Sequence, residues 1–176
     1  MNSDRQVIHL AIAFDQNYLQ PFYALSTSIL RNHTNEIVFI HAITTGISDE
    51  EKSNITNYIE EHNARISFYS IDETFVNQFV VINKWTSAVY YRLFFPLLIP
   101  HDIPRLLYLD TDVIVNGRLT ELFSTDLDGF PLAAVYDNYV KRQPLLDIHE
   151  EGEYFNSGVL LMDLNHWRVQ KNSEGA

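Results

Sequence analysis

The chain has 176 residues, of which 46% are hydrophobic and 13% aromatic, enough apolar side chains for one domain with a buried core. Its formal charge of −11, from 12 basic and 23 acidic residues, argues against a nucleic-acid partner and against anionic membranes. The absence of cysteine excludes disulfides and thiolate metal sites. The N-terminus lacks the apolar core of a signal peptide, and no apolar stretch reaches the roughly 20 residues of a membrane span. We therefore expect a cytoplasmic protein, and this segment supports no membrane association.

The first half of the chain alternates between predicted strands and helices. Short apolar or β-branched runs predict strands over residues 7–14, 36–43 and 66–71. Pro21 can open a helix, and an apolar stripe continues that helix to about Arg31. Ser48 and Glu51 form a capping box, which predicts a second helix with Ile55 and Ile59 on its apolar face.

The second half continues this alternation with shorter elements. We expect a helix over residues 87–95, stopped by Pro96 and Pro100, and a strand over 105–109. Two later short strands are predicted at 132–136 and 159–162. The order strand, helix, strand, helix, strand is typical of an α/β fold, with one wound, mostly parallel sheet flanked by helices.

Acidic side chains follow the predicted strands. Asp15, Asp110, Asp112 and Asp137 each come after a strand, and ligands of wound α/β sheets bind beyond the carboxyl ends of the strands. Because successive side chains of a strand point to opposite faces, we expect Asp110 and Asp112 to emerge on the same side. Two charges in an apolar run are costly to desolvate, and a divalent cation with oxygen ligands would neutralise them. The alternative is a turn that caps a helix or leaves the sheet into water.

No glycine-rich loop follows the first strand, where the chain reads Phe14-Asp15-Gln16-Asn17-Tyr18, and no Walker-type lysine loop is present. If a nucleotide binds, a metal ion must therefore hold its phosphates instead of a glycine cradle.

Four blocks of sequence occur in a familiar order: Ala-Phe-Asp-Gln-Asn-Tyr at 13–18, Tyr-Arg-Leu at 91–93, Leu-Tyr-Leu-Asp-Thr-Asp at 107–112 and Tyr-Phe-Asn-Ser-Gly-Val-Leu at 154–160. Together they resemble the family 8 glycosyltransferases, in particular the lipopolysaccharide galactosyltransferase and glucosyltransferase branch. The resemblance runs from about Val7 to Arg168. It implies a GT-A type fold, a Mn²⁺ (or Mg²⁺) cofactor, and retaining transfer from UDP-glucose or UDP-galactose to a glycan or glycolipid acceptor.

The resemblance also implies roles for individual residues. Asp110 and Asp112 would ligate the metal, and Asp110 would also lie near the ribose or sugar. Tyr18 would stack on uracil. The remaining donor-binding residues would be Asp15 and Asn17 at the base or ribose, Arg92 at the sugar or phosphates, Asp137 and Asn156 at the sugar hydroxyls, and Thr111 and Ser157 inside the matching blocks.

Each of these residues also has a structural interpretation that the sequence leaves open. Tyr18 could cap the core, and Arg92 could serve an internal ion pair. Asn156, before Ser157-Gly158, suits a tight turn, and Asp137 could solvate a loop. Lys84 is interpreted as a surface lysine and Trp85 as a core residue.

The chain lacks two motifs that lie further downstream in the family: an Asp-Gln-Asp segment and a His-x-x-Gly-x-x-Lys-Pro-Trp stretch, which supplies the third metal ligand and a phosphate-binding lysine. We therefore expect residues 1–176 to form a single donor-binding domain, truncated before the C-terminal catalytic and metal-ligand segment, with catalytic residues unknown. The polar segment 137–153 is expected to be loosely ordered. The alternative function is a non-catalytic nucleotide-sugar-binding module, or a subunit that needs a partner segment.

Overall fold

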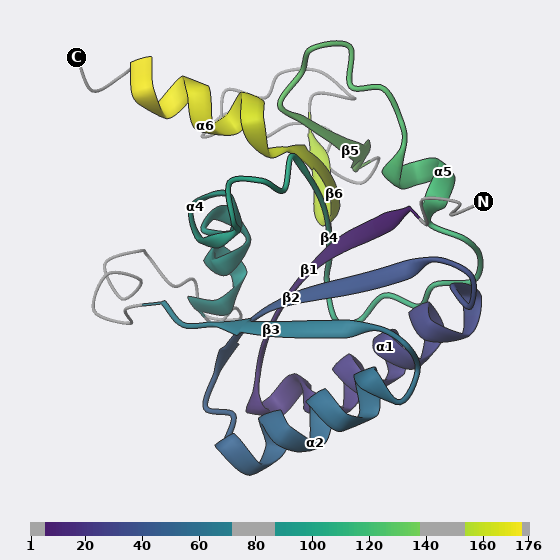
Figure 1. Cartoon of the computed structure of the whole chain (residues 1–176). Coiled ribbons are helices and arrows are strands. Elements are labelled where there is room, and N and C mark those ends of the chain that lie inside the picture. The colour runs from purple at the N-terminus through teal and green to yellow at the C-terminus, as the bar shows by residue number, and fades with distance from the viewer. Residues whose placement is uncertain (1–5, 72–86, 138–153, 174–176) are drawn as a thin grey trace.

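A single mixed β-sheet forms the centre of the protein in the computed structural model, which describes residues 6–71, 87–137 and 154–173 (Figure 1). The sheet has six strands in the order β3-β2-β1-β4-β6-β5. Their bounds are β1 (Val7–Asp15), β2 (Ile37–Thr45), β3 (Arg65–Tyr69), β4 (Arg105–Leu109), β5 (Leu132–Tyr136) and β6 (Phe155–Asp163). The expectations for Lys84, Trp85 and residues 138–153 lie outside the described residues.

Strand direction decides which ends of the strands meet. Strands β1 to β4 pair in parallel, as predicted, whereas β6 is antiparallel to both β4 and β5. The carboxyl ends of β1, β4 and β5 therefore share one edge of the sheet with the amino end of β6. This arrangement brings the end of β4 next to the start of β6, although many residues separate them in the sequence.

Helices cover both faces of the sheet, so the central strands are apolar on both sides. Helices α1 (Leu19–Asn32) and α2 (Asp49–Glu60) pack on one face, and the 3₁₀ helix η2 (Ser87–Leu93), α4 (Phe95–Leu98) and α6 (Leu164–Ser173) lie on the other (Figure 1). Phe22, Leu25 and Ile29 of α1 are fully buried. Two short elements complete the list, η1 (Gln16–Tyr18) and α5 (Thr120–Phe123).

Of the capping box predicted for α2, the N-cap is confirmed, because the Ser48 hydroxyl accepts a hydrogen bond from the Glu51 N–H at 3.2 Å. The Glu51 carboxylate accepts from the Tyr23 hydroxyl at 2.9 Å, and among the described residues it makes no return bond to the Ser48 N–H. The predicted strands at 105–109 and 132–136 have the expected bounds. The strand expected at 159–162 is longer, because its first residues pair with β5 beyond a bulge.

Two predictions about proline were wrong. Helix α1 begins at Leu19, two residues before Pro21. The predicted helix at 87–95 is instead a 3₁₀ helix that ends at Leu93, and Pro96 lies in the first turn of α4. The reason is the same at both sites: the first N–H groups of a helix have no partner within the helix, so proline is tolerated there.

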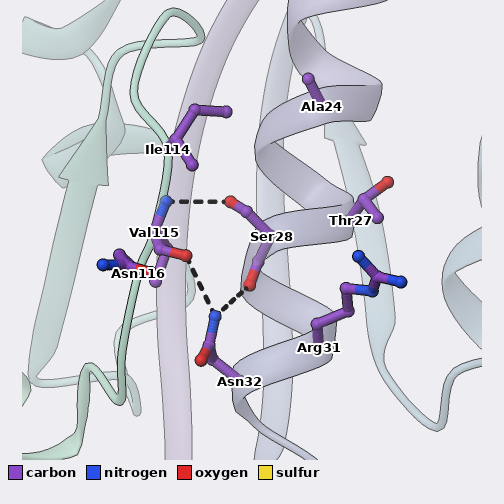
Figure 2. Close-up of a pocket in the computed structure, with 8 residues that line it drawn as sticks. All are labelled: Ala24, Thr27, Ser28, Arg31, Asn32, Ile114, Val115 and Asn116. Atoms are coloured by element: carbon purple, nitrogen blue, oxygen red, sulfur yellow. Dashed lines mark hydrogen bonds between the residues drawn. The ribbon is translucent and has the colours of Figure 1, made fainter.

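The chain that follows β4 is held against α1 (Figure 2). The Val115 N–H donates to the Ser28 hydroxyl at 3.0 Å, and the Asn32 side-chain amide donates to the Val115 carbonyl at 3.0 Å. Further along, the Leu119 N–H donates to Nε2 of the buried His33 at 2.8 Å. These contacts fix the segment that leaves the Asp110-Thr111-Asp112 turn.

A hollow of about 440 Å³ lies between α1 and this segment (Figure 2). Its lining includes Thr27, Arg31 and Asn116, and none of the predicted site residues contributes to it. Among the described helices, none combines the length and apolarity needed to span a bilayer.

Candidate functional site

Asp110, Thr111 and Asp112 form a turn at the end of β4. The Asp110 N–H donates to the Gly158 carbonyl at 2.8 Å, which extends the β4–β6 ladder by one residue. The Val113 N–H then donates back to the Asp110 carbonyl at 3.2 Å. The expectation that Asp110 and Asp112 lie on one side assumed that the strand continues through them. This assumption was wrong, because β4 ends at Leu109 and the backbone turns after Asp110. Thr111 is buried in this turn, whereas Asp112 is exposed.

Two donors hold one oxygen of the Asp110 carboxylate. The Tyr108 hydroxyl donates to Oδ1 at 2.6 Å, and Nη2 of Arg92 donates to the same oxygen at 3.0 Å. The Arg92 side chain is only 11% exposed, against 32% for Asp110, so the ion pair is open on the carboxylate side. Charge-assisted hydrogen bonds of this kind are the strong ones.

Arg92 also connects this carboxylate to β6. Its Nη1 donates to both the backbone carbonyl and the hydroxyl of Ser157. Its guanidinium carbon lies 4.8 Å from the centre of the Tyr108 ring, a cation–π contact. The internal ion pair that the sequence left open for Arg92 is therefore present, and contact with a ligand stays a prediction.

The other oxygen of Asp110, Oδ2, lies over Gly158. It accepts no hydrogen bond from the described residues. A Cβ on Gly158 would lie 2.9 Å from Oδ2 and 3.0 Å from Oδ1 of Asn156. Oδ2 can occupy this position because Gly158 has no side chain.

The electrostatics of Tyr108 report on both carboxylates. Burial raises the pKa of Tyr108 well above its usual value, and the charge of Asp110 adds to this, while Arg92 opposes it. The hydrogen bond to Asp110 and the charge of Asp112 raise the pKa further. The hydroxyl therefore stays protonated as a donor, and Asp112 lies close enough to act on it.

Asp15, Asn17 and Tyr18 lie at the carboxyl end of β1, the neighbour of β4. Asp15 caps η1, with its Oδ1 accepting from the Asn17 N–H at 2.8 Å. Tyr18 is 45% exposed, which argues against the alternative that it caps the core. An exposed ring at this edge remains available for stacking on a base.

Asp137 and Asn156 lie where β5 and β6 meet the same edge. The Asp137 N–H donates to the Tyr154 carbonyl at 3.0 Å, which continues the strand pairing. The tight turn that the sequence suggested for Asn156 is absent, because residues 156–158 lie within β6; Oδ1 of Asn156 instead accepts from the Gly158 N–H at 2.8 Å inside the strand. Its amide nitrogen has no partner among the described residues. Because the register shifts between Ala134 and Val135, residues 157–159 bulge out of the β5 pairing.

The donor chemistry of this edge suits a hard divalent cation. Oδ2 of Asp110 and the exposed carboxylate of Asp112 are oxygen ligands, and both are free of hydrogen bonds from the described residues. In the described part of the chain, no three or more histidine, cysteine or acidic side chains are grouped so that they could hold a metal ion. These residues could therefore hold a cation through two carboxylates, with phosphate or water oxygens completing the shell.

The sequence analysis did not identify Tyr108 and Gly158 as residues of the site. The signal for Tyr108 was its position two residues before Asp110, because residues i and i+2 of a strand share a face. Gly158 carried only a turn signal, and its closeness to Asp110 depends on the β4–β6 pairing, which no local pattern predicts.

Comparisons with known proteins agree with this geometry. The family model described as Glycosyl transferase family 8 matches residues 9–176. A lipopolysaccharide 1,2-glucosyltransferase of Escherichia coli (strain K12) is 31% identical over 175 residues, covering 97% of this chain and 52% of the relative. General stress protein A of Bacillus subtilis (strain 168) is 28% identical, covering 96% and 60%. The chain thus spans roughly half the length of these curated relatives.

Among solved structures, the galactosyltransferase LgtC in complex with donor and acceptor sugar analogues superimposes with a TM-score of 0.82 at 30% identity. The match covers 95% of this chain and 63% of LgtC. The predicted GT-A type fold is confirmed. The match of the family model to nearly the whole chain shows that this protein belongs to glycosyltransferase family 8.

Proposed function

We propose that this chain is the donor-binding portion of a retaining hexosyltransferase that uses UDP-glucose or UDP-galactose and a divalent cation. The observation that carries the proposal is the Asp110 carboxylate: one oxygen is held by two protein donors, and the other lies over Gly158 without a donor among the described residues, in the turn where Asp112 is exposed. Family membership supports sugar transfer, and the names of the relatives point to glucose or galactose and to glycan acceptors.

In this proposal, different residues of the site bind the cation, the uracil and the sugar. A Mn²⁺ or Mg²⁺ held by Asp110 and Asp112 would stabilise the negative charge on the departing diphosphate. Arg92 supplies a fixed positive charge beside these carboxylates, which limits their mutual repulsion in a chain of net charge −11. The exposed Tyr18 ring offers its face to the uracil, and Asn156 offers its free amide nitrogen to a sugar hydroxyl.

A second candidate is a nucleotide-sugar-binding module without turnover. It is favoured by the two-carboxylate site, because the described residues bring no third acidic or histidine ligand to it. Both candidates require metal-dependent binding of UDP, and they differ in whether this chain cleaves the sugar–phosphate bond.

Titration calorimetry with UDP in the presence and absence of Mn²⁺ tests the common step. We expect Mn²⁺ to strengthen UDP binding, and the double variant Asp110→Asn, Asp112→Asn to lose that gain. The control is the double variant Asp49→Asn, Glu50→Gln, which removes the same charge from exposed positions at the start of α2. Equal metal dependence in both double variants would refute a cation held by Asp110 and Asp112. Hydrolysis of a UDP-sugar by the chain in Mn²⁺ buffer then separates the enzyme from the module.

A further inference from the structure

We propose that Tyr108 is a positioning residue that orients the Asp110 carboxylate for the cation, by committing Oδ1 to the protein and leaving Oδ2 for the ligand. This inference rests on the proposed function and adds a residue to it. Tyr108 would touch neither the cation nor the sugar, and would act only through Asp110.

The Tyr108 ring is well placed to fix a neighbour. It is 1% exposed, and β4 pairs at this position with Ala11 of β1 and Leu160 of β6. The Phe95 ring packs against it, with 6.0 Å between ring centres. A ring enclosed in this way has a single orientation, so its hydroxyl is a fixed donor 2.6 Å from Oδ1.

Two donors are needed to fix the orientation of the Asp110 carboxylate. Arg92 reaches Oδ1 from η2, whereas Tyr108 reaches it from within β4. A carboxylate held by Arg92 alone could rotate about its Cβ–Cγ bond and exchange its two oxygens. The second bond opposes that exchange, and Gly158 provides the space in which Oδ2 then lies. Partners of this kind, which orient a metal ligand without binding the metal, change metal affinity by about 10- to 100-fold when they are removed.

Replacing the hydroxyl alone tests this role. In Tyr108→Phe the ring that packs on Phe95 and Arg92 remains, and only the bond to Oδ1 is lost. The matched control is Tyr69→Phe on β3, whose hydroxyl bonds the His41 ring at 2.9 Å. Tyr69 lies three strands away from β4, about 14 Å at the usual strand spacing. In a further variant, 4-aminophenylalanine at position 108 retains a donor at the same ring position.

The readout is the affinity of the 176-residue chain for Mn²⁺ in the presence of UDP. It is measured from the electron paramagnetic resonance signal of free Mn²⁺, at a temperature below the thermal unfolding midpoint of each variant. We expect Tyr108→Phe to weaken Mn²⁺ binding by about 10-fold or more, Tyr69→Phe to leave it unchanged, and 4-aminophenylalanine to restore most of the loss. UDP binding without metal should be equal in all four chains.

The outcomes separate the two proposals. If the unchanged chain binds no Mn²⁺ with UDP, the proposed function fails, and the role of Tyr108 fails with it. If the unchanged chain and both Phe variants bind Mn²⁺ equally, the proposed function stands and the positioning role is refuted. A loss in Tyr108→Phe that the amino group does not restore also refutes it, because the effect then comes from packing and not from the hydrogen bond.

Discussion

Adding one methyl group at Gly158 gives the sharpest test of how the Asp110 carboxylate is placed. The new Cβ of Gly158→Ala would lie 2.9 Å from Oδ2 of Asp110 and 3.0 Å from Oδ1 of Asn156, whereas ordinary contacts begin near 3.4 Å. The carboxylate must therefore move by about 0.5 Å or rotate, against the hydrogen bonds from Tyr108 and Arg92 that hold its other oxygen. The backbone at this position is not in the left-handed region, so the substitution adds no backbone strain to this crowding.

The size of the effect follows from the crowding. Overpacking a well-packed site costs about 1–3 kcal/mol, which for a chain of this size lowers the unfolding midpoint by roughly 2–12 °C. Because Oδ2 is the oxygen proposed to meet the cation, Mn²⁺ affinity in the presence of UDP should fall as well. Gly117→Ala is the matched control, since no atom lies within 4 Å of its added Cβ.

Thermal unfolding followed by circular dichroism, together with Mn²⁺ titration, measures both effects. We expect Gly158→Ala to unfold at lower temperature and to bind Mn²⁺ more weakly, while Gly117→Ala binds Mn²⁺ as the unchanged chain does and unfolds at no lower a temperature. If Gly158→Ala binds Mn²⁺ as tightly as Gly117→Ala does, the placement of Oδ2 against Gly158 has no bearing on the cation, and the reasoning is refuted.

Two further predictions concern stability. Burial, together with a smaller effect of the neighbouring His9, lowers the pKa of His41 to about 3, so native His41 stays neutral where the unfolded chain takes up a proton. The free energy of unfolding that depends on neutral His41 is fully present well above pH 6.5, the ordinary pKa of histidine in the unfolded chain. It decreases as the pH falls below that value, by about 2 kcal/mol at pH 5. Urea unfolding at pH 7 and pH 5 should show a smaller loss of stability for His41→Gln than for His62→Gln, a substitution at an exposed position in the turn after α2, and equal losses would contradict the account. The Arg168 side chain donates to five backbone carbonyls around the end of α4, so Arg168→Met should cost about 1–3 kcal/mol in thermal unfolding. The exposed Arg31→Met is its control, and an equal midpoint for the two variants would show that these bonds do not stabilise the fold.

Much of the fold could be predicted because local patterns determine it. The buried strand at 105–109 and the Ser48 N-cap of α2 are set by residues close in sequence, and both were predicted at the right positions. The antiparallel β6 was not, since its direction depends on pairing with β4, a contact between segments about 50 residues apart. The 3₁₀ helix at 87–93 was misjudged because its apolar spacing also fits an α-helix.

The candidate site divides in the same way. Asp110 and Asp112 stood out because charges in an apolar run are rare, and their place after a strand followed from the pattern. What Asp110 does with each oxygen could not be predicted, because Arg92 and Gly158 reach it from other elements. Arg92, for which the family resemblance implies ligand binding, forms an ion pair with Asp110 and so holds this carboxylate in place without a ligand.

Crystals of the chain grown with UDP and Mn²⁺ offer the most direct measurement, because anomalous scattering locates manganese without reference to the protein atoms. We expect one anomalous peak within coordination distance of both Oδ2 of Asp110 and the Asp112 carboxylate, with the diphosphate on its far side. A bound UDP with manganese elsewhere, or with no manganese at these two carboxylates, would contradict the account.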